Sequence, residues 1–178
     1  MCHRNFIMRR PINLIVSAAI VLLLPLHSAT ADPIGGTATE AISATPKSTY
    51  GPAEVVTLQM QALGSNDDPF KNAGIEITFR FASPTNKRMT GPLDRFALLF
   101  DSPAYAPMLN HQMLEVGPED IRGGRAVVPV FIETEDSTRL SYLFVLSRQA
   151  AESTECGGCW MTDSVYPLIA TNPDQTGV

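Results

Sequence analysis

The spacing of apolar residues changes at His111, and this change restricts the folds that the chain can adopt. Upstream of His111, apolar residues recur three and four positions apart, as in Val56, Met60 and Leu63, which is typical of a helix with one buried face. Downstream, the chain is rich in β-branched and aromatic residues, which favour strands. The expected strands are 112–116, 125–134, 139–149 and 160–168. Helices followed by consecutive strands predict the α+β class, with helices packed on an antiparallel sheet of about four strands.

Two of the expected helices have recognisable ends. The segment 52–63 starts with a proline, which suits the first helical position, and Gly64 follows its end. A later helix opens after Gly91-Pro92, and its apolar face consists of Leu93, Phe96, Ala97 and Phe100. Among the strands, Gly123-Gly124 predicts a hairpin turn.

The segment 75–81 carries two conflicting patterns. Ile75, Ile77, Phe79 and Phe81 alternate with polar residues, which favours a strand. Ile75 and Phe79 also share one face of a helix. Ser83-Pro84 is expected to end the segment in either case, because the residue before a proline avoids helical geometry.

The N-terminus has the features of an export signal. Arg4, Arg9 and Arg10 form a basic region, the apolar stretch 14–26 follows, and Ala29-Thr30-Ala31 supplies the small residues that a signal peptidase requires. We expect residues 1–31 to be removed and the protein to be periplasmic or extracellular. An uncleaved anchor is disfavoured, because the apolar stretch is shorter than the roughly 20 residues of a spanning helix.

The charge of the chain limits its partners. It has 13 basic and 18 acidic residues, and the signal segment contains three of the basic ones and none of the acidic ones. The exported part is therefore strongly acidic, which disfavours nucleic acid and anionic membrane surfaces. We expect a flexible lead-in at 32–51, one α+β domain at 52–170 and a flexible tail at 171–178.

Several phrases resemble an uncharacterised family, domain of unknown function 4864. The most specific are FRFASP at 79–84 and GPLDRF at 91–96. Further matching positions are Val55-Val56, Gln59, Ala62-Leu63, Gly74-Ile75, Tyr105, Pro107, 144–147 and 160–165. The resemblance spans about 53–166 and implies a cone-shaped fold of the nuclear transport factor 2-like kind, with N-terminal helices across a curved antiparallel sheet. It also implies a helix at 75–81, which we adopt, and a secreted or lumenal setting. It supplies no catalytic residue.

Cys156 and Cys159 are the thiols that remain once the signal, with Cys2, is removed. A redox-active pair needs its first cysteine at a helix N-terminus, whereas Cys159 leads into a predicted strand. A structural zinc site needs four ligands, and His111 and Asp163 are the only other strong candidates. We expect a structural disulfide, with a redox pair, free thiols and a metal site as alternatives, and we expect no metal.

Five residues are candidates for ligand binding. His111 is the sole histidine after the signal and the only imidazole acid or base, with Asp163 as its potential partner. Arg80 suits a carboxylate or phosphate, although an internal ion pair is the structural alternative. Tyr105 and Trp160 suit an apolar pocket, although such residues are more often core.

Three functions remain open. Export, acidity, the expected cone cavity and the lack of a catalytic set favour a binding or accessory domain for a small apolar ligand or a protein partner. A structural or oligomer-forming protein is the second, with the sheet face as the contact of a homodimer. The third is an isomerase- or dehydratase-like enzyme that uses His111 and Asp163, and fold analogy alone supports it. We expect no cofactor, no nucleic acid partner and no stable membrane anchor.

Overall fold

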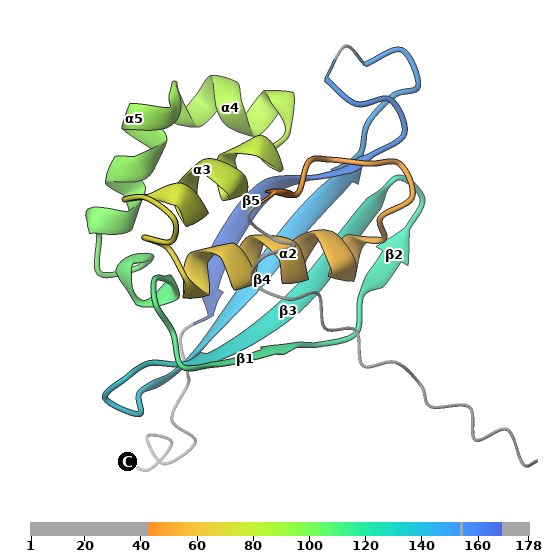
Figure 1. Ribbon diagram of the computed structural model, residues 1–178. Helices are drawn as coiled ribbons and strands as arrows, with labels where there is room; N and C mark the ends of the chain where they lie inside the picture. The colour runs from red at the N-terminus through yellow and green to blue at the C-terminus, as the bar shows by residue number, and fades with distance from the viewer. Residues whose placement is uncertain (1–42, 154, 169–178) are drawn as a thin grey trace, which may run out of the picture. The chain divides into compact units, whose positions relative to one another are not determined.

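The computed structural model describes residues 43–153 and 155–168, and its helices lie against one face of an antiparallel sheet (Figure 1). The helices are α2 (Pro52–Gly64), α3 (Ala73–Arg80), α4 (Pro84–Thr90) and α5 (Leu93–Ala97), followed by the 3₁₀ turns η1 (Leu98–Asp101) and η2 (Ala106–Met108). The strands are β1 (Met113–Val116), β2 (Asp120–Arg122), β3 (Arg125–Glu133), β4 (Arg139–Arg148) and β5 (Trp160–Leu168). The expected α+β class is confirmed. The predicted signal segment, 1–31, and tail, 171–178, lie outside the described residues.

The sheet has five strands in the order β1-β3-β4-β5, with the short β2 pairing with β3 beside β1. It is open, and it contains the four expected strands together with β2, which the sequence pattern did not reveal. Gly123-Gly124 forms the predicted turn between β2 and β3, where Gly123 has φ 62°. A bulge interrupts the β4–β5 ladder beside Val145, because Val145 pairs with Ser164 and Leu146 pairs with Thr162.

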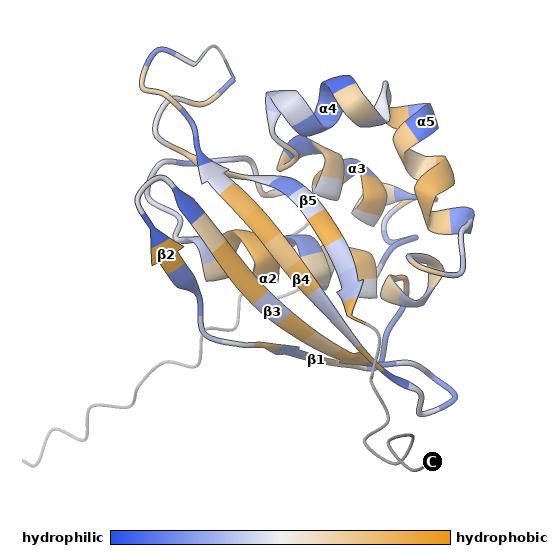
Figure 2. Ribbon diagram, turned by 180° about the vertical axis from the view of Figure 1, so that it is seen from behind, coloured by the Kyte–Doolittle hydropathy of each residue, from blue (hydrophilic) through white to orange (hydrophobic). Residues whose placement is uncertain are grey.

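Alternating burial along β3 and β4 defines an inner and an outer face of the sheet. The inner residues of β3 are Ala126, Val128, Val130 and Ile132, and those of β4 are Tyr142, Phe144 and Leu146. Because successive side chains of a strand point to opposite faces, these residues lie together on the face that packs against the helices. Figure 2 shows the opposite face, which no helix of the described chain covers.

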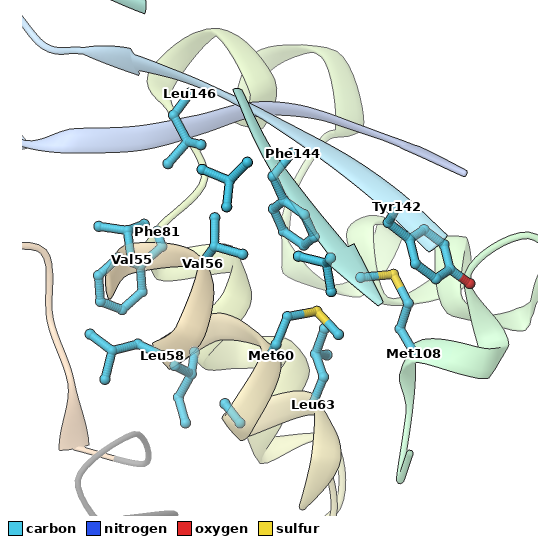
Figure 3. Close-up of a cluster of buried hydrophobic side chains, with 14 of the residues drawn as sticks. Val55, Val56, Leu58, Met60, Leu63, Phe81, Met108, Tyr142, Phe144 and Leu146 are labelled. Atoms are coloured by element: carbon cyan, nitrogen blue, oxygen red, sulfur yellow. The ribbon is translucent and has the colours of Figure 1, made fainter. Parts of the chain in front are cut away.

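Helix α2 supplies the other half of the core. Val56, Met60 and Leu63 have no exposed surface, and Figure 3 shows Met60 and Leu63 opposite Phe144 of β4. These are the residues whose spacing predicted the helix. Ala44 and Tyr50, within the predicted lead-in, also pack in or against this core.

The segment with conflicting patterns is helical, as the family resemblance implied. Ala73, Ile75, Ile77 and Thr78 of α3 are all buried, so the polar Thr78 shares the buried face with apolar residues and the segment alternates in sequence like a strand. Helix α3 also packs closely against α2 at Gly74, where a Cβ would lie 2.1 Å from the carbonyl oxygen of Ala62.

Helix α4 was not expected. Ser83-Pro84 ends α3 as predicted, but the same two residues begin a new helix. The Ser83 hydroxyl accepts a hydrogen bond of 3.1 Å from the backbone N–H of Asn86, and Pro84 occupies the first turn. A serine cap followed by proline is a helix-start signal, which the sequence analysis treated only as a stop.

Candidate functional site

A pocket of about 360 Å³ opens between α4, the two 3₁₀ turns and β5. Its base lies against α2, α3 and β4, and it contains the buried residues Gln59, Thr78, Phe144 and Thr162. A cavity of this volume falls within the range of small-molecule sites. It is the candidate site because it combines apolar walls with a small group of buried polar side chains.

The buried polar group centres on Thr162, at the start of β5. Its hydroxyl donates to the side-chain carbonyl of Gln59 at 2.8 Å, and the Gln59 amide donates to the backbone carbonyl of Thr78 at 3.2 Å. Gln59 is 1% exposed and Thr162 is 3% exposed. These bonds connect α2, α3 and β5 beneath the pocket and compensate for the removal of their polar atoms from water.

Asn86 of α4 extends this polar group along one side of the pocket. Its side-chain amide donates to the backbone carbonyl of Thr162 at 3.2 Å. The Thr90 hydroxyl donates to the backbone carbonyl of Asn86 at 2.9 Å. Because Ser83 fixes the start of α4, it also sets the positions from which Asn86 and Thr90 line the pocket.

Aromatic and sulfur-containing side chains form the remaining walls. Phe96 and Phe100 meet edge to face, with ring centres 5.8 Å apart, and Met108 closes the pocket from η2. Three large apolar residues at the pocket stay exposed, Met89 by 74%, Leu99 by 37% and Tyr166 by 55%. The apolar surface of the pocket thus continues onto the surface of the protein.

Tyr105, a predicted ligand-binding residue, lies in this pocket. Its hydroxyl donates to the backbone carbonyl of Val165 on β5 at 3.0 Å. Nearby, the hydroxyl of the inward-facing Tyr142 donates to the carbonyl of Ala104, and burial raises the pKa of that phenol. Both hydroxyls are therefore used to hold the chain around η2.

Asp163 also borders the pocket, but its carboxylate is directed to the outer face of the sheet. It accepts a hydrogen bond of 2.9 Å from the hydroxyl of Ser147, and the Arg125 guanidinium lies 4.0 Å away. Ser147 follows the inward-facing Leu146, so its side chain lies on the outer face. The bulge in β5 places Asp163 in this position.

Trp160 and Arg80 are both engaged in contacts within the fold. Trp160 is 8% exposed and belongs to the hydrophobic core at the start of β5. Arg80 forms an ion pair of 2.6 Å with Glu76, one helical turn earlier, and both side chains are 36% exposed. Neither residue borders the candidate pocket.

His111 lies in a different pocket, between α2 and β1, with a volume of about 470 Å³. Its Nδ1 donates to the backbone carbonyl of Met108 at 2.9 Å, since a carbonyl can only accept. The ring packs over Gly64, where a Cβ would lie 3.0 Å from Cε1. Burial lowers the pKa of His111, and the bond to Met108 only partly opposes this effect. His111 and Asp163 thus border separate pockets, and no hydrogen bond or ion pair joins them within the described residues.

Sequence reasoning did not identify Gln59, Asn86 and Thr162. Gln59 stands among the apolar residues of α2. A polar residue on the buried face of a helix is unusual, and this position was the available signal in the sequence. Asn86 was hidden because its helix was not expected. The pairing of these residues depends on contacts between α2, α4 and β5 that no local pattern encodes.

The predicted disulfide between Cys156 and Cys159 is present, and the two Cα atoms are 5.6 Å apart. It closes a turn in the β4–β5 connection, and Glu155 of this turn pairs with Lys87 of α4 at 2.6 Å. Among the described residues, no group of three or more histidine, cysteine or acidic side chains is arranged to hold a metal ion.

The outer face of the sheet is a further exposed apolar surface. Phe131 of β3 and Leu168 of β5 both pair with Ser141 of β4, so the three lie in a row across the sheet. Phe131 is 43% exposed and Leu168 is 42% exposed. The ion pair between Arg139 and Glu133, at 2.9 Å, borders this surface, and Glu115 of β1 pairs with Phe131 on its other side.

No family model, curated protein or solved structure matches this chain. In the part of the chain that the structure describes, no helix has the length and apolar character needed to cross a membrane.

Proposed function

We propose that this protein is an exported, non-catalytic binding module that holds a small apolar ligand in the pocket beside α4 and β5. The pocket itself carries the proposal: apolar walls surround a buried polar group. Among the described residues, the only carboxylate that borders it is bonded to Ser147 on the other face of the sheet. The separation of His111 from Asp163 supports binding over catalysis, because an imidazole base needs an orienting acceptor within hydrogen-bond reach.

Binding of N-phenyl-1-naphthylamine, a neutral dye that fluoresces in apolar surroundings, tests this function. We expect the purified protein to bind the dye. Val165→Trp, which adds bulk inside the pocket, should abolish the fluorescence increase. Phe131→Ser, which removes an apolar side chain from the outer face, should leave it unchanged. Loss of binding in Phe131→Ser but not in Val165→Trp would place the dye on the sheet and refute the proposal.

The exposed outer face supports a second candidate, the formation of a homodimer through the sheet. The Arg139–Glu133 ion pair beside Phe131 balances its own charge, so a second copy of this acidic chain meets Phe131 and Leu168 without like-charge repulsion from that pair. Two-fold contacts between identical surfaces are the commonest oligomeric arrangement.

Native mass spectrometry of the wild type and two variants tests the dimer. Phe131→Lys should shift the protein to monomer, whereas Met89→Lys, which changes a more exposed apolar residue on the helical side, should not. A wild-type protein that remains monomeric at high micromolar concentration argues against this candidate.

The proposal includes export and membership of the family that the chain resembles. N-terminal sequencing of the exported protein should begin at Asp32. Recovery of the 14–26 segment in the membrane fraction would contradict cleavage.

A further inference from the structure

Two buried amide side chains in the pocket retain hydrogen-bonding capacity. A side-chain amide nitrogen carries two N–H groups. The Gln59 amide uses one on the carbonyl of Thr78, and the Asn86 amide uses one on the carbonyl of Thr162. Within the described residues, the second N–H of each has no acceptor. Gln59 is 1% exposed and Asn86 is 9% exposed, so bulk water has little access to these donors.

The orientation of both amides follows from their partners. The groups that face the two nitrogens are backbone carbonyl oxygens, which accept hydrogen bonds and cannot donate them. Exchanging nitrogen and oxygen in either side chain would place two acceptors against each other. The hydrogen-bond partners therefore identify which end of each amide is nitrogen, a choice that the shape of the side chain alone does not decide.

Thr162 brings the two amides together. Its hydroxyl bonds to Gln59 and its backbone carbonyl bonds to Asn86, so both side chains meet at one residue of β5. Gln59 and Asn86 therefore border the same pocket from two helices, and each unused donor favours a ligand atom that accepts a hydrogen bond.

The charge of the pocket restricts what that atom can belong to. Apart from two tyrosines, Asp163 is the only ionisable residue that lines it in the described part of the chain, and its carboxylate lies on the outer face with Ser147 and Arg125. A charged ligand group inside the pocket would lose its hydration without gaining a counter-charge, which is costly. A neutral acceptor, such as a carbonyl oxygen, loses far less hydration free energy when it enters the pocket.

We propose that the pocket selects neutral apolar molecules that carry a carbonyl group, with the carbonyl oxygen accepting from the Asn86 and Gln59 amides. The apolar part of the ligand lies between Phe96, Phe100 and Met108 and extends toward the exposed Met89 and Leu99. This inference rests on the proposed binding function and adds the chemical class of the ligand.

Competition between two probes of the same shape tests the inference. 2-Acetylnaphthalene and 2-isopropenylnaphthalene differ in having a carbonyl oxygen or a methylene at one position. Each is used to displace N-phenyl-1-naphthylamine from the purified protein, and the ratio of the two dissociation constants is measured. We expect the preference for the ketone to fall about threefold to tenfold in Asn86→Leu, which is the range for one neutral hydrogen bond. Gln112→Leu, an amide removal outside the pocket, should leave the ratio unchanged.

The outcomes separate this inference from the function on which it rests. If the dye does not bind the wild type at all, the proposed binding function fails. If the dye binds and is displaced, but the ratio is the same in the wild type and in Asn86→Leu, the binding function stands and carbonyl recognition is refuted. Gln59→Met gives a second measurement of the same ratio if Asn86→Leu does not fold by circular dichroism.

Discussion

The hydroxyl of Thr162 on β5 donates a hydrogen bond of 2.8 Å to the side-chain carbonyl of Gln59 on α2, which lies 103 residues earlier in the chain. Both residues are buried, so the bond is shielded from water. It connects the helical layer to the edge strand of the sheet, directly below the candidate pocket. The pocket therefore depends on the same contact that holds α2 against β5.

Gln59→Leu should reduce the free energy of unfolding by about 2 kcal/mol, because the Thr162 hydroxyl and the Thr78 carbonyl would be buried without their partner. Urea denaturation measures the change. Thr57→Ala is the matched control on the same helix, since the Thr57 hydroxyl bonds only within its own helix, to Ala53. Equal losses in the two variants would show that the bond to Thr162 makes no special contribution.

Gly74→Ala should destabilise the protein by about 1–3 kcal/mol, the range for forcing extra volume into a packed core. The added methyl would collide with the backbone of α2 at Ala62, which no side-chain rotation can relieve. Gly124→Ala adds the same methyl where no atom lies within 4 Å, and its melting temperature should stay close to that of the wild type. A stable Gly74→Ala variant would mean that α2 and α3 are less closely packed than described.

The stability of the wild type should decrease as the pH falls below about 6.5, the pKa of an unperturbed histidine. Burial lowers the pKa of His111 in the folded state, so the unfolded state takes up the proton first. Since the unfolded state then binds more protons, unfolding becomes more favourable at low pH and stability is retained above about 6.5.

Denaturation midpoints at pH 7.5 and 5.5 measure this effect. We expect the denaturation midpoint of His111→Gln to fall less between pH 7.5 and pH 5.5 than that of the wild type. Measurements between pH 7.5 and 8.5, where His111 is already neutral, provide the control. Over this range, the midpoint should change with pH by the same amount in His111→Gln and in the wild type. An unchanged loss in His111→Gln would assign the pH dependence to other groups.

Cys156 and Cys159 should both resist a thiol reagent in the denatured, unreduced protein. Removing the bond with Cys156→Ser and Cys159→Ser together should lower the free energy of unfolding by about 2 kcal/mol, as the chain-entropy model gives for so short a loop. Reactive thiols at these positions, or reduction of insulin that disappears in Cys156→Ser, would favour the redox alternative.

Much of the fold could be predicted from local patterns. β3 and β4 were predictable because both segments are rich in β-branched and aromatic residues, which favour strands. Helix α2 was predictable because Val56, Met60 and Leu63 recur at helical spacing and share its buried face. Where burial is one-sided, the sequence records the periodicity of the element.

The pattern was ambiguous where a polar residue is buried beside apolar ones. Thr78 of α3 is buried and stands between Ile77 and Phe79, so the segment alternates in sequence and resembles a strand. At Ser83, the same residue ends one element and caps the next, and only the bond to the Asn86 N–H shows the second role. The position of Asp163 depends on a bulge in β5, which turns its carboxylate away from the pocket and from His111.

The sequence by itself determined the class of the fold, the main strands, the first helix and the disulfide pair, because each follows from residues that are neighbours along the chain. Only the tertiary structure decided which polar residues meet. Gln59, Asn86 and Thr162 lie on three different elements and are far apart in sequence. They meet because α2 and α4 both pack against β5, which brings the two amide side chains to the hydroxyl and the carbonyl of Thr162. Such convergence has no local signature, since it depends on how the buried faces pack rather than on the order of residues within any one element.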